Sequence, residues 1–189
     1  MNKGARGKDK FHLLLFGQKA VFSRKEATVF RKFVLTFELN RTKDESMQSS
    51  LTAEEIRLVQ DSIQHILPLA QSTGENFYQR LFTIAPQLRP LFKNDMAAQS
   101  RKLMTILIHI IANLDDFQRV DNELRELARR HIAYHVKEED YRFIGEALFW
   151  TLAQIEEIEW TPALADAWDA AYANIANVML EEHQDKGGD

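Results

Sequence analysis

The sequence predicts an all-α fold for the chain from residue 47 onward, and three observations support this fold class. Apolar residues recur three or four positions apart along most of this part, which is the spacing of one helix face. Residues that typically begin helices, such as Thr52 and the pair Thr161–Pro162, stand directly before these periodic stretches. No stretch after residue 47 shows the convincing apolar–polar alternation of a half-buried strand.

The composition bounds the class of protein. The chain has 189 residues, enough for one domain and an appendage, and its 45% hydrophobic and 28% charged residues are ordinary globular values. The absence of cysteine excludes disulfides and thiolate metal sites and suits a cytoplasmic location. No apolar run approaches the length of about 18 residues that a membrane span needs, and no glycine-rich loop is present to bind phosphate.

Residues 1–46 form a basic extension that differs in charge from the rest. They hold 11 Lys and Arg against 5 Asp and Glu, whereas residues 47–189 hold 13 against 23. The five acidic residues and the lack of a long apolar core argue against a targeting sequence. A basic arm can contact nucleic acid or an anionic membrane, but we expect no nucleic-acid partner. We predict a poorly ordered extension over 1–46, a folded domain over 47–185 and a tail over 186–189.

The first helices of the domain are predicted from their boundaries. Thr52–Glu55 forms a capping box, in which the threonine hydroxyl and the glutamate carboxylate each satisfy a free backbone amide. Pro68 and the cluster Ser72–Gly74 predict a bend after this helix. A second helix then runs to about Ala85, and Pro86 ends it before a short apolar turn.

Four more helices follow in order. One spans about 97–114 with a mostly apolar face, and the next contains His131. Asp140 is predicted to cap a long apolar helix, and Thr161–Pro162 to open the last one with a cap followed by proline at the first helical position. The domain therefore holds helices joined by short connections.

His131 lies at the end of an apolar helical stripe. The stripe consists of Leu124, Leu127 and Ala128, while the neighbouring arginines point elsewhere. A neutral imidazole on an apolar face suits an iron whose flat organic ring needs one axial nitrogen and a dry pocket. A lone histidine is more often a hydrogen-bonded core residue, so this interpretation depends on what else the chain supplies. Tyr141, ten residues later, could carry a hydroxyl towards this imidazole.

The order of these groups along the chain resembles the globin family, in particular the bacterial single-domain haemoglobins and the globin domain of flavohaemoglobins. The resemblance covers roughly residues 50–182. Four segments carry it: Asn76–Phe82 with Pro86 and Leu91–Phe92; Gln99–Leu103; Arg130–Lys137 with Tyr141 and Ile144–Leu148; and Trp168–Tyr172 with Asn177–Val178. It implies a globin fold, a three-on-three helical sandwich, that binds haem b (iron protoporphyrin IX).

The resemblance also implies a role for each residue. His131 would be the proximal ligand of the iron, Phe92 would wedge the haem, and Leu103 would line it. Tyr78 would be the distal tyrosine and Gln99 the distal polar residue, and both would stabilise a bound ligand. A buried hydroxyl donor would contribute about 1–3 kcal/mol to that stabilisation.

On the proximal side, Tyr141 would tune the basicity of His131. Flavohaemoglobins place a glutamate near the end of the domain, which completes a His–Tyr–Glu network. Alignment puts Asp185 at that position, with Glu182 as the alternative, and the shorter aspartate departs from the family pattern. His135 is expected past the helix end. The remaining histidines considered, His65, His109 and His183, belong to no recognisable constellation.

The resemblance implies reversible binding of oxygen, nitric oxide or carbon monoxide, as in oxygen transport. It also implies conversion of nitric oxide to nitrate if an external reductase supplies electrons, because no glycine-rich reductase loop is present. A homodimer is compatible with this family. Two alternatives stay open: a haem-based sensor or interaction module acting through the basic arm, and a globin-shaped domain that binds no haem. The sequence does not decide whether the iron is five- or six-coordinate at rest.

Overall fold

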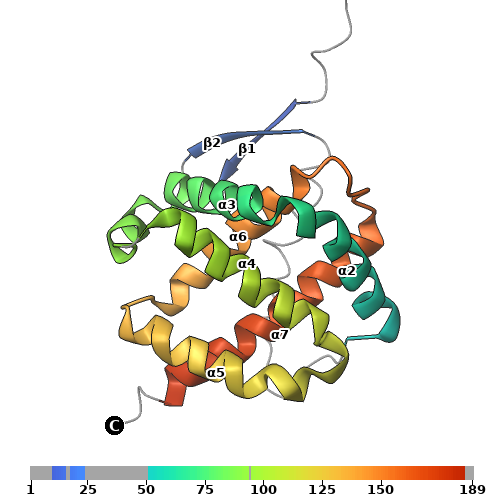
Figure 1. Cartoon of the computed structure of the whole chain (residues 1–189). Coiled ribbons are helices and arrows are strands. Elements are labelled where there is room, and N and C mark those ends of the chain that lie inside the picture. The colour runs from blue at the N-terminus through green and yellow to red at the C-terminus, as the bar shows by residue number, and fades with distance from the viewer. Residues whose placement is uncertain (1–9, 16–17, 24–50, 94, 186–189) are drawn as a thin grey trace, which may run out of the picture.

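A computed structural model describes residues 10–15, 18–23, 51–93 and 95–185. The described part of the domain is built from α-helices linked by short 3-10 helices (Figure 1). The α-helices are α2 (Ala53–Ile66), α3 (Ala70–Ile84), α4 (Met96–Ala112), α5 (Phe117–Ala133), α6 (Tyr141–Ala153) and α7 (Pro162–Asp185). The 3-10 helices are η1 (Leu67–Leu69), η2 (Pro86–Leu91), η3 (Leu114–Asp116) and η4 (Glu138–Asp140). The predicted all-α class is confirmed for the domain.

Two strands precede the domain. β1 (Lys10–Leu15) and β2 (Gln18–Ser23) pair antiparallel, with Lys10 opposite Ser23 and Leu15 opposite Gln18. No strand was predicted here. Each strand is short, and a short apolar run gives only a weak signal for a hairpin. The rest of the predicted extension and the tail 186–189 lie outside the described residues, so the order of 1–46 stays a prediction.

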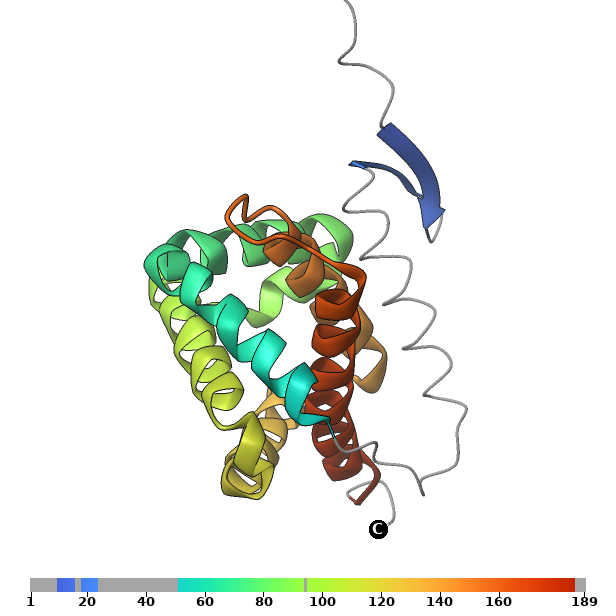
Figure 2. The same cartoon turned by 90° about the vertical axis from the view of Figure 1, so that its right-hand side faces the viewer.

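The helices pack in two layers. In Figure 1, α2, α4 and α5 lie towards the viewer, α6 and α7 lie behind them, and α3 crosses at the top. The main packing pairs are α3 with α4, α3 with α6, α5 with α7 and α2 with α7. Figure 2, turned by 90°, shows α2 crossing beside α7. Each amphipathic helix therefore buries its apolar face against at least one neighbouring helix.

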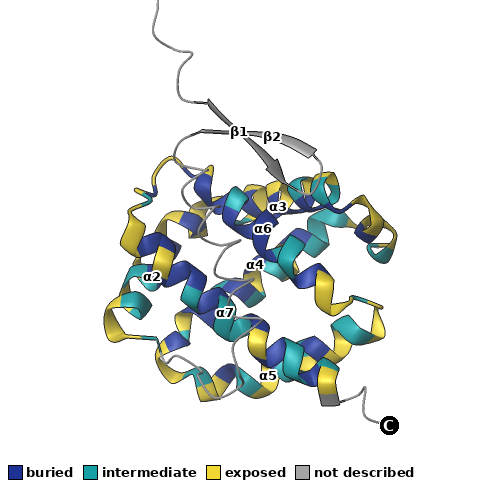
Figure 3. Ribbon diagram, turned by 180° about the vertical axis from the view of Figure 1, so that it is seen from behind, coloured by how far each residue is buried: buried dark blue, intermediate teal, exposed yellow. Residues whose placement is uncertain are grey.

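The core between the layers is apolar, and the indole nitrogen of its buried tryptophan has a hydrogen-bond partner. Phe149 on α6 and Trp168 on α7 are among its largest fully buried side chains, and Figure 3 shows the buried faces of α6 and α7 turned inward. The indole nitrogen of Trp168 donates to the hydroxyl of Ser62 on α2 at 3.0 Å. This bond satisfies the one polar atom of a side chain that contributes a large apolar surface.

The predicted boundaries hold at both ends of the domain. Thr52 caps α2, and its capping box with Glu55 is complete. Pro162 is the first residue of α7, and the Thr161 hydroxyl accepts from the amide of Leu164 at 3.2 Å. Of the helices that the structure describes, none is both long and apolar enough to cross a membrane.

Three predicted features differ from the structure. Only Pro68 marks the bend, in η1, because Gly74 lies inside α3. Asp140 does not cap α6: its carboxylate accepts from the amide of Lys137 at 2.9 Å and stabilises η4 instead. The helix predicted over 97–114 begins at Met96 and ends at Ala112, where η3 follows shortly after.

Gly74 has a packing role that explains its place within a helix. A Cβ at Gly74 would lie 2.9 Å from both the Cβ and the carbonyl oxygen of Ser100 on α4. The missing side chain lets the backbones of α3 and α4 approach closely. This crossing fixes the position of the residues that follow Gly74 on α3 relative to those around Ser100 on α4.

Candidate functional site

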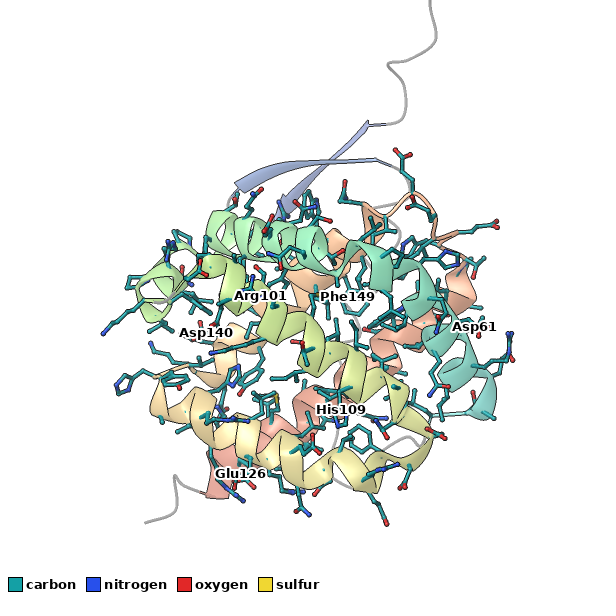
Figure 4. The ribbon with its side chains drawn as sticks, in the orientation of Figure 1. Asp61, Arg101, His109, Glu126, Asp140 and Phe149 are labelled. Atoms are coloured by element: carbon teal, nitrogen blue, oxygen red, sulfur yellow. The ribbon has the colours of Figure 1, made fainter. Side chains whose placement is uncertain are left out.

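The candidate site lies between α4 and α5. These helices are joined by η3 and diverge from it, because α4 packs on α3 while α5 packs on α7 (Figure 1). Near the junction, His109 on α4 lies 3.0 Å from the carboxylate of Glu123 on α5, and Figure 4 labels His109 there. Gln99, near the start of α4, and His131, near the end of α5, both belong to the diverging ends.

His131 has the tautomer that an iron ligand requires. Its Nδ1 lies 2.8 Å from the carbonyl oxygen of Leu127, one helical turn earlier. A carbonyl only accepts hydrogen bonds, so Nδ1 carries the proton and Nε2 keeps a free lone pair. Burial lowers the pKa of His131, although the bond to Leu127 opposes the shift and the positive charge of Arg130 adds to it. The imidazole is therefore neutral at neutral pH, with Nε2 available.

Tyr141 stands beside this imidazole at the start of α6. The two rings are stacked with their centroids 6.5 Å apart and an interplanar angle of 28°. Tyr141 is buried, and burial raises the pKa of its phenol well above the ordinary value, with a further contribution from the charge of Asp140. The hydroxyl of Tyr172 on α7 donates to the backbone carbonyl of Tyr141 at 2.6 Å and fixes its position.

The hydroxyl of Tyr141 meets a histidine rather than a carboxylate. It lies 3.4 Å from Nε2 of His183 on α7, and the two rings meet edge to face with centroids 5.7 Å apart. Sequence reasoning assigned no role to His183. The signal was present, because His183 stands four residues after buried Met179 and continues the inward stripe of the last helix.

Glu182, the alternative carboxylate, is engaged elsewhere. Its two oxygens accept from the guanidinium of Arg129 at 3.0 and 3.2 Å, and Arg125 lies 3.5 Å away. Arg125 also pairs with Glu181 at 3.0 Å. These four residues form an ion cluster that joins α5 to α7. The side chain of Asp185, the other candidate for the proximal network, lies outside the described residues.

The distal residues form a compact group on α3, η2 and α4. Tyr78 is buried, and its ring packs against Phe82 and Phe92 with centroids 5.8 and 5.2 Å away. Burial raises the pKa of Tyr78 to about 12, and an interaction with the side chain of Gln99 opposes this rise. Tyr78 therefore keeps its proton, as a hydrogen-bond donor must. The structure places the ring of Tyr78 against that of Phe92, and the distal roles of Tyr78 and Gln99 stay predictions.

Half-buried apolar side chains extend from this group along the two diverging helices. Leu103 lies one turn after Gln99 on α4 and packs against the main core while remaining partly accessible. The other half-buried apolar residues on and beside these helices include Ile106, Leu127, Val136 and Ile144. A flat apolar ring between α4 and α5 would cover such surfaces, so the residues present fit a haem with His131 as its axial nitrogen.

His135 does not lie beside His131. His135 is exposed, lies past the end of α5 and has a backbone φ of 64°, so it does not share a helix face with His131. Within the described residues there is no group of three or more His, Asp or Glu side chains that could hold a metal ion.

A largely buried ion pair, which the sequence did not predict, joins α3 to α6. Arg80 on α3 and Glu146 on α6 form an ion pair at 3.0 Å, and the Arg80 guanidinium also lies 5.1 Å from the ring centre of Trp150. Burial raises the pKa of Glu146, while the charge of Arg80 opposes this shift. The pair ties α3 to α6, and its residues are too far apart in sequence for a pattern to join them.

Comparisons with known proteins agree with this arrangement. The family model described as Globin matches residues 75–179. A flavohemoprotein of Vibrio cholerae is 27% identical over 69% of this chain, which corresponds to 34% of that protein. A globin-like protein of Aquifex aeolicus is also 27% identical, over 69% of this chain and 92% of that protein. The chain thus spans about a third of the length of the flavohemoprotein it matches.

Solved structures show the same fold. A bacterial globin of Campylobacter jejuni superposes with a TM-score of 0.64 at 21% identity, covering 73% of this chain and all of that one. Myoglobin of Aplysia limacina superposes with a TM-score of 0.63 at 16% identity, covering 70% of this chain and 98% of that one. The predicted three-on-three helical sandwich is confirmed. Since the family model covers more than half of its residues, the chain belongs to the globin family.

Proposed function

We propose that this chain is a haem protein in which Nε2 of His131 is the axial ligand of haem b. The support is chemical: the Leu127 carbonyl fixes the proton on Nδ1, and burial keeps the imidazole neutral. Haem iron held by one imidazole offers an open position at which oxygen and other diatomic gases bind. The proposal includes a cytoplasmic location, which a chain without cysteine suits.

The distal group would stabilise the gas ligand. The observation that carries the proposed function is the buried group of Tyr78, Phe82 and Phe92, in which the pKa of the Tyr78 hydroxyl rises to about 12. The rings of Phe82 and Phe92 pack against the ring of Tyr78 and hold it in place, and Gln99 would add an amide near its hydroxyl. The protonated hydroxyl of Tyr78 can then donate to the partly negative outer atom of bound oxygen.

The finer proposal is reversible oxygen binding, with nitric oxide conversion to nitrate as the reaction that an external reductase would sustain. Similarity to flavohemoproteins supports this reaction class, and those relatives are matched only in about a third of their length. Within this chain, Tyr78 and Gln99 would hold the gas, Phe92 and Leu103 would pack against the ring, and Tyr141 would support His131.

The first test is an absorption spectrum of the purified full chain in the ferric, ferrous and carbon monoxide forms. We expect a Soret band that shifts with carbon monoxide and that is lost or strongly altered in His131→Ala. The matched control is His135→Ala, four residues away and exposed, which should leave the spectrum unchanged. A protein that takes up no added haemin, or a His131→Ala variant with an unaltered spectrum, would contradict the proposed function.

A second test addresses the reaction. Mixing the oxygen-loaded protein with nitric oxide should yield nitrate in a one-to-one ratio, and added reductant should restore activity for further turnovers. Tyr78→Phe should shorten the lifetime of the oxygen-loaded form without preventing haem uptake, because the phenol acts on the ligand and not on the ring. Oxygen binding without nitrate formation would leave a gas carrier and remove the dioxygenase proposal.

A further inference from the structure

His183 closes a row of three rings on the proximal side. Its ring meets Tyr141 edge to face, and Tyr141 in turn stacks on His131. The three residues come from α7, α6 and α5, so the row exists only in the folded chain. The Tyr141 hydroxyl lies 3.4 Å from Nε2 of His183, at the long end of hydrogen-bond distances.

The carboxylates near this row are bound to other groups. Glu182, next to His183, is held by Arg129 and Arg125. Asp140, next to Tyr141, accepts from the backbone amide of Lys137 and contributes to the high pKa of the Tyr141 phenol. In the described residues, the recorded side-chain partner of the Tyr141 hydroxyl is thus an imidazole.

We propose that His183 is a positioning residue for the proximal ligand: its imidazole holds the Tyr141 hydroxyl and keeps a carboxylate out of contact with the His131–Tyr141 pair. This inference rests on the proposed function, because it concerns how His131 binds iron. A carboxylate partner would push negative charge towards the ligand and raise its basicity, whereas an imidazole in that place orients Tyr141 without bringing a negative charge. The chain is therefore set for reversible gas binding, with a weaker electron push from the proximal side.

Tyr141 is held in a position from which its contact with His183 can influence His131. Its backbone is anchored by Tyr172 at 2.6 Å and its ring lies against His131. The freedom that remains is the orientation of its ring and hydroxyl, which His183 restricts. A group at position 183 consequently acts on His131 through Tyr141, by orientation and by charge.

The test compares three substitutions in the haem-loaded full chain. His183→Gln keeps an uncharged hydrogen-bonding group, His183→Glu introduces a carboxylate, and His183→Leu removes the polar contact. The readouts are the iron–histidine stretching frequency of the ferrous protein and the ferric–ferrous midpoint potential. His65→Glu, on the exposed side of α2, makes the same change in charge away from the row and is the matched control.

We expect His183→Glu to raise the stretching frequency and lower the midpoint potential, while His65→Glu changes neither. His183→Gln should stay close to the unsubstituted protein, and His183→Leu should broaden the stretching band because the Tyr141 ring loses its fixed orientation. The inference is overturned if the Glu and Gln variants match each other, or if the Gln and Leu variants do.

A double substitution tests the route through Tyr141. In a Tyr141→Phe background, the difference between the Glu and Gln variants should shrink, because the hydroxyl that meets position 183 is gone. An undiminished difference would mean that the charge acts directly on the iron and would overturn the role assigned to Tyr141. If the unsubstituted protein binds no haem at all, the proposed function itself fails, and this inference fails with it.

Discussion

The two sides of the site are held by different physical means. On the distal side, Tyr78 and Gln99 are positioned by the close crossing of α3 and α4 at Gly74, and their neighbours are aromatic and uncharged. On the proximal side, His131 stands on a helix joined to α7 by the ion cluster of Arg125, Arg129, Glu181 and Glu182. The comparison teaches that close packing orients the proposed distal groups, while charge pairs between α5 and α7 hold the helix that carries the proposed iron ligand.

The largest effect is expected from Gly74→Ala. The new methyl group would lie within 2.9 Å of the Ser100 backbone, so α3 and α4 must separate. We expect a loss of about 1–3 kcal/mol in the free energy of unfolding and a displacement of Tyr78 on α3 from Gln99 on α4, seen as faster oxygen dissociation. Asn76→Ala, exposed on the same helix, is the control. An unchanged stability would show that the crossing is looser than the structure has it.

Tyr78→Phe should affect the ligand without loosening the helices. The loss of a buried donor costs about 1–3 kcal/mol of ligand stabilisation, which corresponds to a roughly 5- to 150-fold faster oxygen dissociation. The ring contacts with Phe82 and Phe92 remain, so the thermal midpoint should change little. Flash photolysis and stopped-flow kinetics measure the rate. An unchanged rate would assign the donor role to another group.

Glu182→Gln tests the proximal cluster. Removing this charge weakens the contact of α7 with Arg129 and Arg125 on α5, and we expect a loss of stability smaller than that of Gly74→Ala. The loss should diminish at high salt, because salt screens the remaining pairs. Glu54→Gln, which breaks an exposed pair within α2, should have almost no effect. Equal effects of the two substitutions in urea unfolding would argue against a special role for the cluster.

The smallest effect is expected from pH. An ordinary tyrosine, with a pKa near 10, is half ionised at that pH, whereas burial raises the pKa of Tyr78 to about 12. A raised pKa means that the hydroxyl keeps its proton and its donor role until the pH approaches that value. The oxygen dissociation rate should therefore stay level between about pH 7 and 10. A rise in the rate centred near pH 10 would indicate an exposed or differently placed phenol.

The local features of the fold were predictable from the sequence. The capping box at Thr52, the opening of α7 at Thr161–Pro162 and the turn at Pro86 each depend on neighbouring residues, and the structure confirms them. Gly74 was misread as part of a bend, because a helical glycine and a turn glycine look alike in sequence. The difference between them is the distance to Ser100 on another helix.

The candidate site divides in the same way. The order along the chain led us to expect Tyr78 near Phe92 and Tyr141 near His131, and these rings do lie together, while their roles stay predictions. The contact of Tyr141 with His183 was not expected from the sequence. Glu182 and His183 are adjacent on α7, and the sequence does not show which of the two side chains points towards Tyr141. Glu182 faces the arginines of α5, and His183 faces the phenol.

The sequence by itself determined the all-α class, the helix ends and the identity of the imidazole, since periodicity, caps and prolines act over a few residues. Only the tertiary structure decided which side chains meet across the layers. The burial of the Tyr78 phenol and the contact of Tyr141 with His183 both depend on how the helices pack, whereas the Nδ1 proton of His131 is fixed within α5 by the Leu127 carbonyl. That packing involves whole helices, and no local pattern carries it.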